Sequence, residues 1–235
     1  MTGVPDRSYP GLARFEPHLE TLPEQQRALW PRLALLPPDA VLYYGTALAL
    51  RLGHRASVDF DFFLPRSFEP GEMVREISAL GSMDVVQSAP NTLGAHVDGV
   101  WLSLFGVELA AIAAAEVTAD TGLPVASLRD LGATKVQTIV DRAEAKDYED
   151  IAALLAAGIE LSDMLGSAQI VFGSRFSPLL ALKALTSFED GDLPTLPEAT
   201  RRRLVAAAAS VDRLPVLGAY APTILPAASR GATSS

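Results

Sequence analysis

The hydrophobic pattern of the first half of the chain is that of strands separated by turns. Short apolar runs predict strands over 41–44, 58–64, 83–88, 92–97 and 100–107. Segments of helical composition lie at 22–36, 47–52 and 70–80. Asp98-Gly99 is a hairpin dipeptide. We therefore expect an α/β (α+β) lobe with a mixed sheet over 38–124. It should follow an N-terminal arm and helix over 1–37, of which residues 1–20 have no periodicity and are expected to be loosely held.

From residue 125 onward the pattern changes to that of helices. Ser127 with Asp130 three positions later is an N-terminal capping pattern. Helices are expected over 128–142, 147–157, 161–170, 178–187 and 197–211. The second of these should end at Gly158. The sequence thus predicts an all-helical domain over 125–215 and a flexible tail over 216–235, which is rich in small residues and proline.

Composition narrows the classes of function. The 235 residues include 19 Lys and Arg and 28 Asp and Glu, a formal net charge of −9. This charge argues against a broadly basic nucleic-acid binder but leaves room for a local basic cleft. Cysteine is absent, which excludes disulfides, thiolate zinc sites and cysteine nucleophiles and fits a cytoplasmic protein. The chain has no signal-peptide pattern at its start and no uncharged apolar run of about 18 residues, so we expect no membrane partner.

Two carboxylates stand out in the second predicted strand. Alternation over 58–64 would place Asp59 and Asp61 on one face, about 7 Å apart. Mg²⁺ is commonly held by one or two carboxylates together with substrate phosphates. A solvated face of an edge strand is the alternative. The neighbouring Phe60 and Phe62 favour a central strand, in which unpartnered aspartates would be costly.

Gly45-Thr46 lies between the predicted strand 41–44 and the predicted helix 47–52. Backbone N–H groups at a helix start bind phosphate, and a glycine allows the phosphate to come close. The alternative is an ordinary strand–helix turn. Together with Asp59 and Asp61, the pattern predicts a triphosphate cradle beside a metal site.

Two separate motifs resemble one protein family. YGTALALRLGHRASVDFDFF (44–63) resembles the Gly-Gly/Ser-Thr … Ser-x-Asp-x-Asp signature of minimal nucleotidyltransferases of the polymerase-beta-like superfamily, and more narrowly that of the AbiEii/AbiGii toxin family. LPVASLRDLGATKVQTIVDRAEAKDYEDIAALL (123–155) is similar to that family's helical signature, a Lys followed after eleven residues by Asp-x-x-Asp. Segment 182–198 is also similar, and the resemblance spans roughly 38–212.

The first motif carries the expected metal and phosphate ligands. The resemblance implies that Asp59 and Asp61 are catalytic and bind metal, with two Mg²⁺ ions in the site. It implies that Gly45 and Thr46 form the phosphate-binding turn and that Ser57 contacts phosphate.

The second motif carries the remaining expected site residues. Lys135, Asp147 and Asp150 match the helical signature. The resemblance implies that Lys135 reaches the nucleotide phosphates and that the two aspartates position it, contact the nucleotide or act as a base. Arg55, in the loop before the first acidic pair, could neutralise triphosphate charge or be a surface residue. The alternative for the helices is simple charge pairing, for which Lys146 and Asp150 have i,i+4 spacing.

The chain departs from the family pattern at two positions. Ser103 stands in the strand where many active nucleotidyltransferases have a third carboxylate, and a serine is a poor Mg²⁺ ligand and base. Asp98, Glu108 or the Asp-x-x-Asp pair are the candidates to replace it. Tyr44 stands where the commoner pattern has glycine, and it is expected to stiffen the turn and narrow the nucleotide pocket.

Two further features carry weaker expectations. His54 matches a frequent family residue and is expected to make a structural hydrogen bond. The triplet Arg201-Arg202-Arg203 is expected on a solvated helix face, with a grip on RNA backbone as the alternative.

The resemblance implies an Mg²⁺-dependent nucleotidyltransferase that moves an NMP from an NTP to an acceptor hydroxyl. The acceptor would be tRNA or protein, and the chain would be the toxin of a toxin–antitoxin pair with a cognate antitoxin, as in phage defence. Two alternatives remain open: a small-molecule nucleotidyltransferase of the antibiotic-modifying type, and an inactive nucleotide- or RNA-binding module in which Ser103 marks lost chemistry.

Overall fold

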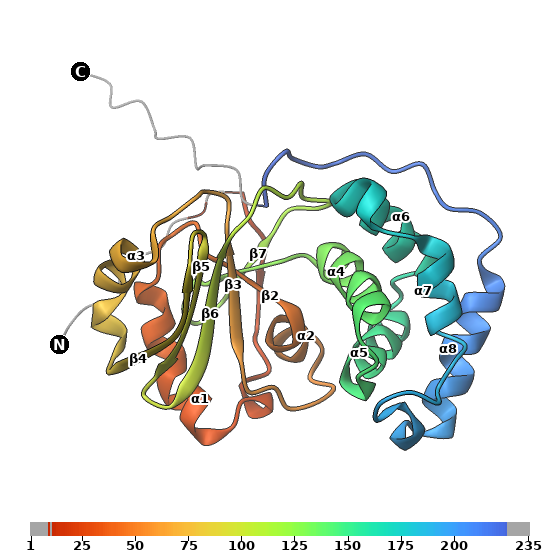
Figure 1. The fold of residues 1–235 in the computed structure, drawn as a ribbon, viewed down its shortest axis with the longest axis horizontal. Helices are drawn as coiled ribbons and strands as arrows, with labels where there is room; N and C mark the ends of the chain where they lie inside the picture. Colours follow the sequence, from red (N-terminus) through yellow and green to blue (C-terminus); the bar gives the residue numbers. More distant parts are fainter. Residues whose placement is uncertain (1–8, 10, 225–235) are drawn as a thin grey trace.

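The computed structural model describes residues 9 and 11–224, which form a mixed sheet followed by a mostly helical region (Figure 1). The strands are β1 (Arg14–Phe15), β2 (Val41–Tyr43), β3 (Phe60–Leu64), β4 (Met83–Ala89), β5 (Thr92–Val97), β6 (Val100–Gly106), β7 (Glu116–Thr118) and β8 (Pro124–Val125). The helices are α1 (Glu24–Leu29), α2 (Tyr44–Leu52), α3 (Pro70–Glu76), α4 (Leu128–Asp141), α5 (Ala145–Ala156), α6 (Leu161–Phe172), α7 (Pro178–Ala184) and α8 (Glu198–Ser210). The expected fold class, a mixed sheet followed by helices, is confirmed.

The sheet has eight strands in the order β1-β7-β8-β2-β3-β6-β5-β4. β3 lies in its interior, antiparallel to β2 and parallel to β6. Helices α1 and α3 lie on one side of the sheet, whereas α2 lies on the other, between the sheet and the bundle of α4 to α8 (Figure 1). The strand that carries Asp61 is therefore central, as its apolar neighbours predict.

Alternation along β3 sends its side chains to two different environments. Phe60 and Phe62 are fully buried, and the Phe60 ring stacks on Trp30, at the end of α1, with ring centroids 6.1 Å apart. Asp61 and Phe63 point to the opposite face, which is the face that α2 covers. The apolar side of β3 thus anchors the strand in the core while its polar position faces the helical region.

The predicted bounds hold for the long elements. The hairpin strands β4, β5 and β6 and the five helices from α4 onward lie where they are expected, and Ser127 Oγ accepts a hydrogen bond from the Asp130 N–H as the capping pattern predicts. Helix 22–36 is shorter than predicted, because α1 gives way to a 3-10 turn over Trp30–Leu35 that has Pro31 at its start. β1, β7 and β8 are absent from the sequence predictions, since two or three residues show no readable alternation.

The described parts of the two terminal segments show more order than the sequence predicts. In the described part of the N-terminal arm, Arg14 and Phe15 pair with β7, and the His18 N–H donates to the Leu50 carbonyl. In the described part of the tail, Ala221 pairs with Ala111 in an isolated antiparallel bridge. The rest of these two segments, residues 1–8, 10 and 225–235, lies outside the described residues.

Candidate active site

The sequence-predicted residues meet in one hollow between the sheet and the helical region. Its volume is about 400 Å³. The lining residues are Gly45, Thr46, Arg55, Ala56, Ser57, Val58, Asp59, Asp61, Lys135, Arg142 and Lys146. Asp147 and Asp150 do not line it; they are fully buried behind Lys135. The hollow therefore contains all the predicted metal- and phosphate-binding residues, with the two helical aspartates beneath it.

The two acidic residues of the first motif differ in their surroundings. β3 begins at Phe60, two residues after the predicted start, so Asp59 is exposed in the preceding loop and only Asp61, half-buried, belongs to the strand. Both residues nevertheless line the same hollow. Burial raises the pKa of Asp61, a hydrogen bond with Ser103 lowers it, and the nearby charge of Asp59 raises it, so that the pKa ends above its ordinary value. A carboxylate in such surroundings gains from a bound cation.

The predicted phosphate turn is the first turn of a helix. α2 begins at Tyr44, three residues before its predicted start, so Gly45 and Thr46 are helical. No side chain caps this helix start, so its first N–H groups have no side-chain partner there, and Gly45 and Thr46 of this turn line the hollow. The buried Thr46 hydroxyl donates to the Asp59 carbonyl and lies 2.8 Å from Ser57 Oγ. Thr46 thus ties the helix start to the loop that carries Asp59.

Gly45 and Tyr44 both stand at positions of this helix start that favour glycine. A Cβ on Gly45 would lie 2.7 Å from Arg55 Nη2, so the glycine makes room for the guanidinium. Tyr44 has φ +57°, in the left-handed region that favours glycine. Its ring does not narrow the phosphate hollow as expected. It packs edge-on against Phe63, with centroids 5.4 Å apart, and lines a neighbouring hollow of about 410 Å³ together with Glu108.

Lys135 is held between the two helical aspartates. Its side chain is 3% exposed, and its Nζ lies 2.7 Å from Asp147 Oδ1 and 2.6 Å from Asp150 Oδ2. Asp147 also accepts a hydrogen bond of 2.8 Å from Arg142 Nε. The expected pair of Lys146 with Asp150 does not form.

Asp150 also joins the helical region to the loop after α2. It accepts hydrogen bonds from Arg55 Nε at 2.7 Å and Nη2 at 2.8 Å, and His54 Nε2 lies 2.7 Å from its Oδ1. The expected structural hydrogen bond of His54 is confirmed. The Arg55 guanidinium donates hydrogen bonds to this buried carboxylate and to the Ala56 carbonyl. Its N–H groups are therefore already engaged within the protein.

Both helical aspartates are ionised. Burial alone would raise the pKa of Asp150, but the hydrogen bond from His54 and the charges of Lys135 and Arg55 bring it far below its ordinary value. Burial also opposes ionisation of Asp147, where Lys135 and Arg142 prevail and lower the pKa. A general base works best with a pKa near the working pH. Of the alternative roles for Asp147 and Asp150, the geometry therefore favours that of positioning Lys135 over that of a general base.

Ser103 occupies the position expected for a third carboxylate. In the β3–β6 register it is the partner of Asp61. Of the replacements considered, Asp98 lies outside the hollow, where it pairs with Arg32 at 2.6 Å, and Glu108 lines the neighbouring hollow. Among the described residues, no group of three or more His, Asp or Glu side chains is arranged to hold a metal. Two carboxylates still fit Mg²⁺, which takes its other ligands from water and substrate phosphates.

Arg142 and Lys146 line the hollow although the sequence predictions give them no phosphate-binding role. Their side chains are 46% and 48% exposed, in contrast to buried Lys135. Arg142 lies two helical turns after Lys135, on the same face, which is the signal that identifies it. Lys146 pairs with Glu144 at 2.8 Å. These are the accessible cations of the hollow.

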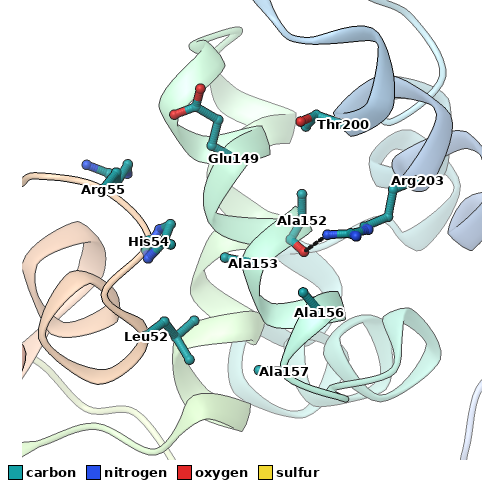
Figure 2. Close-up of a pocket in the computed structure, with 10 residues that line it drawn as sticks. All are labelled: Leu52, His54, Arg55, Glu149, Ala152, Ala153, Ala156, Ala157, Thr200 and Arg203. Carbon is teal, nitrogen blue, oxygen red and sulfur yellow. Dashed lines mark hydrogen bonds between the residues drawn. The ribbon is translucent and has the colours of Figure 1, made fainter.

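A second, larger groove shares Arg55 with this hollow and is also lined by His54 (Figure 2). Its volume is about 700 Å³, its floor is the alanine-rich face of α5, and α8 forms the far wall. Arg203, the last residue of the arginine triplet, lines this groove and donates a hydrogen bond to the Ala152 carbonyl at 3.5 Å. Arg201 donates to the Leu196 carbonyl, so a solvated helix face describes only part of the triplet.

The described residues include no single helix with the length and hydropathy of a membrane span. The length and hydropathy of a span are met only when α5 and the segment Leu161–Arg175 are taken together, and these two are bent by 117° relative to each other.

The helical half of the chain is similar to a known protein family. Residues 105–219 match the family model described as "Nucleotidyl transferase AbiEii toxin, Type IV TA system". An uncharacterized protein of Aquifex aeolicus (strain VF5) is 32% identical over 131 residues, which is 54% of this chain and 64% of that protein's length. The chain thus covers less than two thirds of this relative. The matched family segment contains Lys135, Arg142, Asp147 and Asp150, whereas Asp59 and Asp61 precede it.

Proposed function

Because the chain carries, over residues 105–219, a domain of the AbiEii nucleotidyltransferase toxin family of type IV toxin–antitoxin systems, we propose that it is an Mg²⁺-dependent enzyme that transfers an NMP from an NTP to an acceptor hydroxyl. One observation carries this proposal: the acidic pair Asp59 and Asp61, an uncapped helix start and the cations around Lys135 line a single hollow. Metal, phosphate and phosphate-neutralising groups are the requirements of this reaction.

Each part of the hollow has a task in the proposed reaction. Asp59 and Asp61 would hold Mg²⁺, which when bound offsets charge on the phosphates. The first N–H groups of α2 and the side chains of Arg142 and Lys146 bind the triphosphate. Lys135 supplies a fixed positive charge beneath it. The acceptor oxygen forms a bond to the α-phosphorus, the bond to the pyrophosphate oxygen breaks, and the proton of the acceptor hydroxyl passes to solvent water.

The acceptor enters from the hollow that Tyr44 and Phe63 line. This hollow adjoins the acidic pair, because Phe63 follows Asp61 by two residues on the same face of β3. A tyrosine held at positive φ is a costly feature, and its ring is placed where an acceptor would pass. We propose that the acceptor is tRNA or protein and that a cognate antitoxin restrains the activity, in keeping with the family.

A transfer assay tests the proposal. Purified protein, Mg²⁺ and each of the four α-labelled NTPs are incubated with and without total tRNA, and label transfer and pyrophosphate release are followed. Asp61→Asn should abolish both, whereas Asp84→Asn, on exposed strand β4, should leave both unchanged. Transfer that survives in Asp61→Asn would refute the metal assignment.

Ser103 favours a second candidate, a nucleotide-binding module without turnover. In this case NTP binds in an Mg²⁺-dependent and Asp61-dependent way, but no pyrophosphate is released with any acceptor. Release of pyrophosphate with label on neither tRNA nor protein would instead point to a small-molecule acceptor.

A further inference from the structure

The indole of Trp101 is seated across strand β5 next to Ser103. Gly94 is the register partner of Ser103 in β5. A Cβ on Gly94 would lie 2.9 Å from two ring atoms of Trp101, so this glycine leaves the space in which the indole lies. The ring of His96, the register partner of Trp101 in β5, packs edge-on against the indole, with centroids 5.1 Å apart. The indole is therefore fixed between neighbours on its strand pair.

The direction of the hydrogen bonds from this indole is determined by chemistry. An indole N–H only donates, and Trp101 Nε1 lies 2.8 Å from Ser103 Oγ, which must accept. The one hydrogen of the Ser103 hydroxyl is then free to be donated. Ser103 is the register partner of Asp61 on the adjacent strand β6, so its hydroxyl lies beside the Asp61 carboxylate, whose oxygens can accept this hydrogen. The three side chains thus lie in a row along which hydrogen bonds can run from Trp101 through Ser103 to Asp61, and we call this row the relay.

We propose that Trp101 and Ser103 are positioning residues that fix the Asp61 carboxylate for a divalent cation, in the place where related enzymes have a third carboxylate. The inference rests on the proposed function in that it takes Asp61 as a metal ligand. A carboxylate has about four lone-pair sites, so one bond from Ser103 restricts its rotation and leaves sites for the metal. Partners of this kind orient metal ligands, and their loss typically lowers metal affinity about 10–100-fold.

The relay also sets the number of metal ions. Ser103 has a neutral hydroxyl in the place of a third carboxylate. Among the residues that line the described hollow, the acidic side chains are therefore those of Asp59 and Asp61. Two divalent ions about 3.5–4 Å apart repel each other and need more negative charge than this. The nucleotide-free protein therefore binds one divalent cation, and a second ion can enter only with the phosphates of the substrate.

Mn²⁺ binding to the full chain without nucleotide tests the relay. Electron paramagnetic resonance counts free Mn²⁺ during a titration, and calorimetry gives the affinity. The wild-type protein should bind one Mn²⁺. Ser103→Ala and Trp101→Phe should weaken binding about 10–100-fold, and Ser103→Thr, which keeps a hydroxyl, should restore it. Ser103→Asp should bind two Mn²⁺ and show the spectrum of a coupled pair.

Matched controls separate the relay from general damage. Ser88→Ala removes an exposed hydroxyl from β4. Trp30→Phe removes an indole N–H that is bonded to Asp120, outside the hollow. Both should bind Mn²⁺ as the wild type does, and thermal melting should confirm that all variants fold.

The failures of the two proposals are distinguishable. If Asp61→Asn abolishes Mn²⁺ binding but Ser103→Ala and Trp101→Phe bind as tightly as the wild type, the relay is wrong and the proposed function stands. Failure of Ser103→Thr to restore binding would also overturn the relay. If the wild type and Asp61→Asn bind Mn²⁺ alike, Asp61 is no metal ligand, and the metal assignment of the proposed function falls together with this inference.

Discussion

Replacement of Asp150 by asparagine should be among the most damaging isosteric changes in the site. The fully buried carboxylate faces four nitrogen atoms of Lys135, Arg55 and His54 at 2.6–2.8 Å. Asparagine keeps the shape but offers one acceptor oxygen, and its NH₂ group must face a donor. Hydrogen bonds to charged groups contribute about 1.5–3 kcal/mol each, and removal of one partner of a buried pair costs about 3–5 kcal/mol. We expect Asp150→Asn to lower the free energy of unfolding by about 3–5 kcal/mol.

Lys135→Met provides the decisive comparison. It removes the cation between the two aspartates, but Asp147 keeps Arg142 and Asp150 keeps Arg55, so no buried carboxylate loses its last cationic partner. The methionine also fills the space of the lysine stem. Lys135→Met should therefore lower the free energy of unfolding by about 1–2 kcal/mol, less than Asp150→Asn does.

Urea unfolding, followed by far-ultraviolet circular dichroism, measures both variants on one scale. The control is Asp163→Asn, which removes a carboxylate from a more exposed pair with Arg129 at 3.6 Å and should change stability by less than about 1 kcal/mol. The order of the two test variants decides the matter. If Lys135→Met destabilises the protein as much as Asp150→Asn or more, Asp150 is not the centre of the network and the reasoning from unpaired charges fails.

Three further predictions follow from the same contacts. Because the pKa of Asp150 is lowered in the folded protein, its stabilisation is complete above the unfolded-state pKa of about 4 and is lost as pH falls toward the folded-state pKa; urea unfolding from pH 6 downward should therefore show a weaker acid loss in Asp150→Asn than in the wild type. Gly45→Ala should displace Arg55 and lower both the melting temperature and NTP affinity, whereas Gly218→Ala, whose Cβ meets nothing within 4 Å, should change neither. Arg142→Ala should weaken NTP binding about 10-fold by calorimetry, and Arg142→Lys, which keeps the charge, should lose less.

The elements that position the site were predictable where the hydrophobic period runs long enough. β6 and α4 show their periods over seven and fourteen residues, and the capping pattern at Ser127 marks the helix start. The start of α2 was not predictable in this way. Tyr44 continues an apolar, aromatic run that favours a strand. The residue types in that run do not indicate the positive φ of Tyr44, at which the chain turns into the helix.

The membership of the hollow was largely predictable, but the pairing of its charges was not. Spacing shows which residues share a face of one helix, as it does for Asp147 and Asp150. Arg55 and Asp150 are 95 residues apart, and their contact follows from the way the helical region packs on α2. The spacing suggests a pair of Lys146 with Asp150, but Asp150 binds Arg55 instead.

The contact between Arg55 and Asp150 determines how the hollow meets its substrate. It joins the loop after α2 to helix α5 and so holds the sheet and the helical region together. Lys135, Arg55 and Arg142 exceed the two helical carboxylates by one positive charge, which faces the acidic pair across the hollow. For Arg55 to bind a triphosphate, it would have to leave a fully buried carboxylate, whereas Arg142 and Lys146 are half-exposed and need only turn. The positively charged contacts to the phosphates should therefore come from the second motif, and Arg55 serves the site by holding its two halves in place.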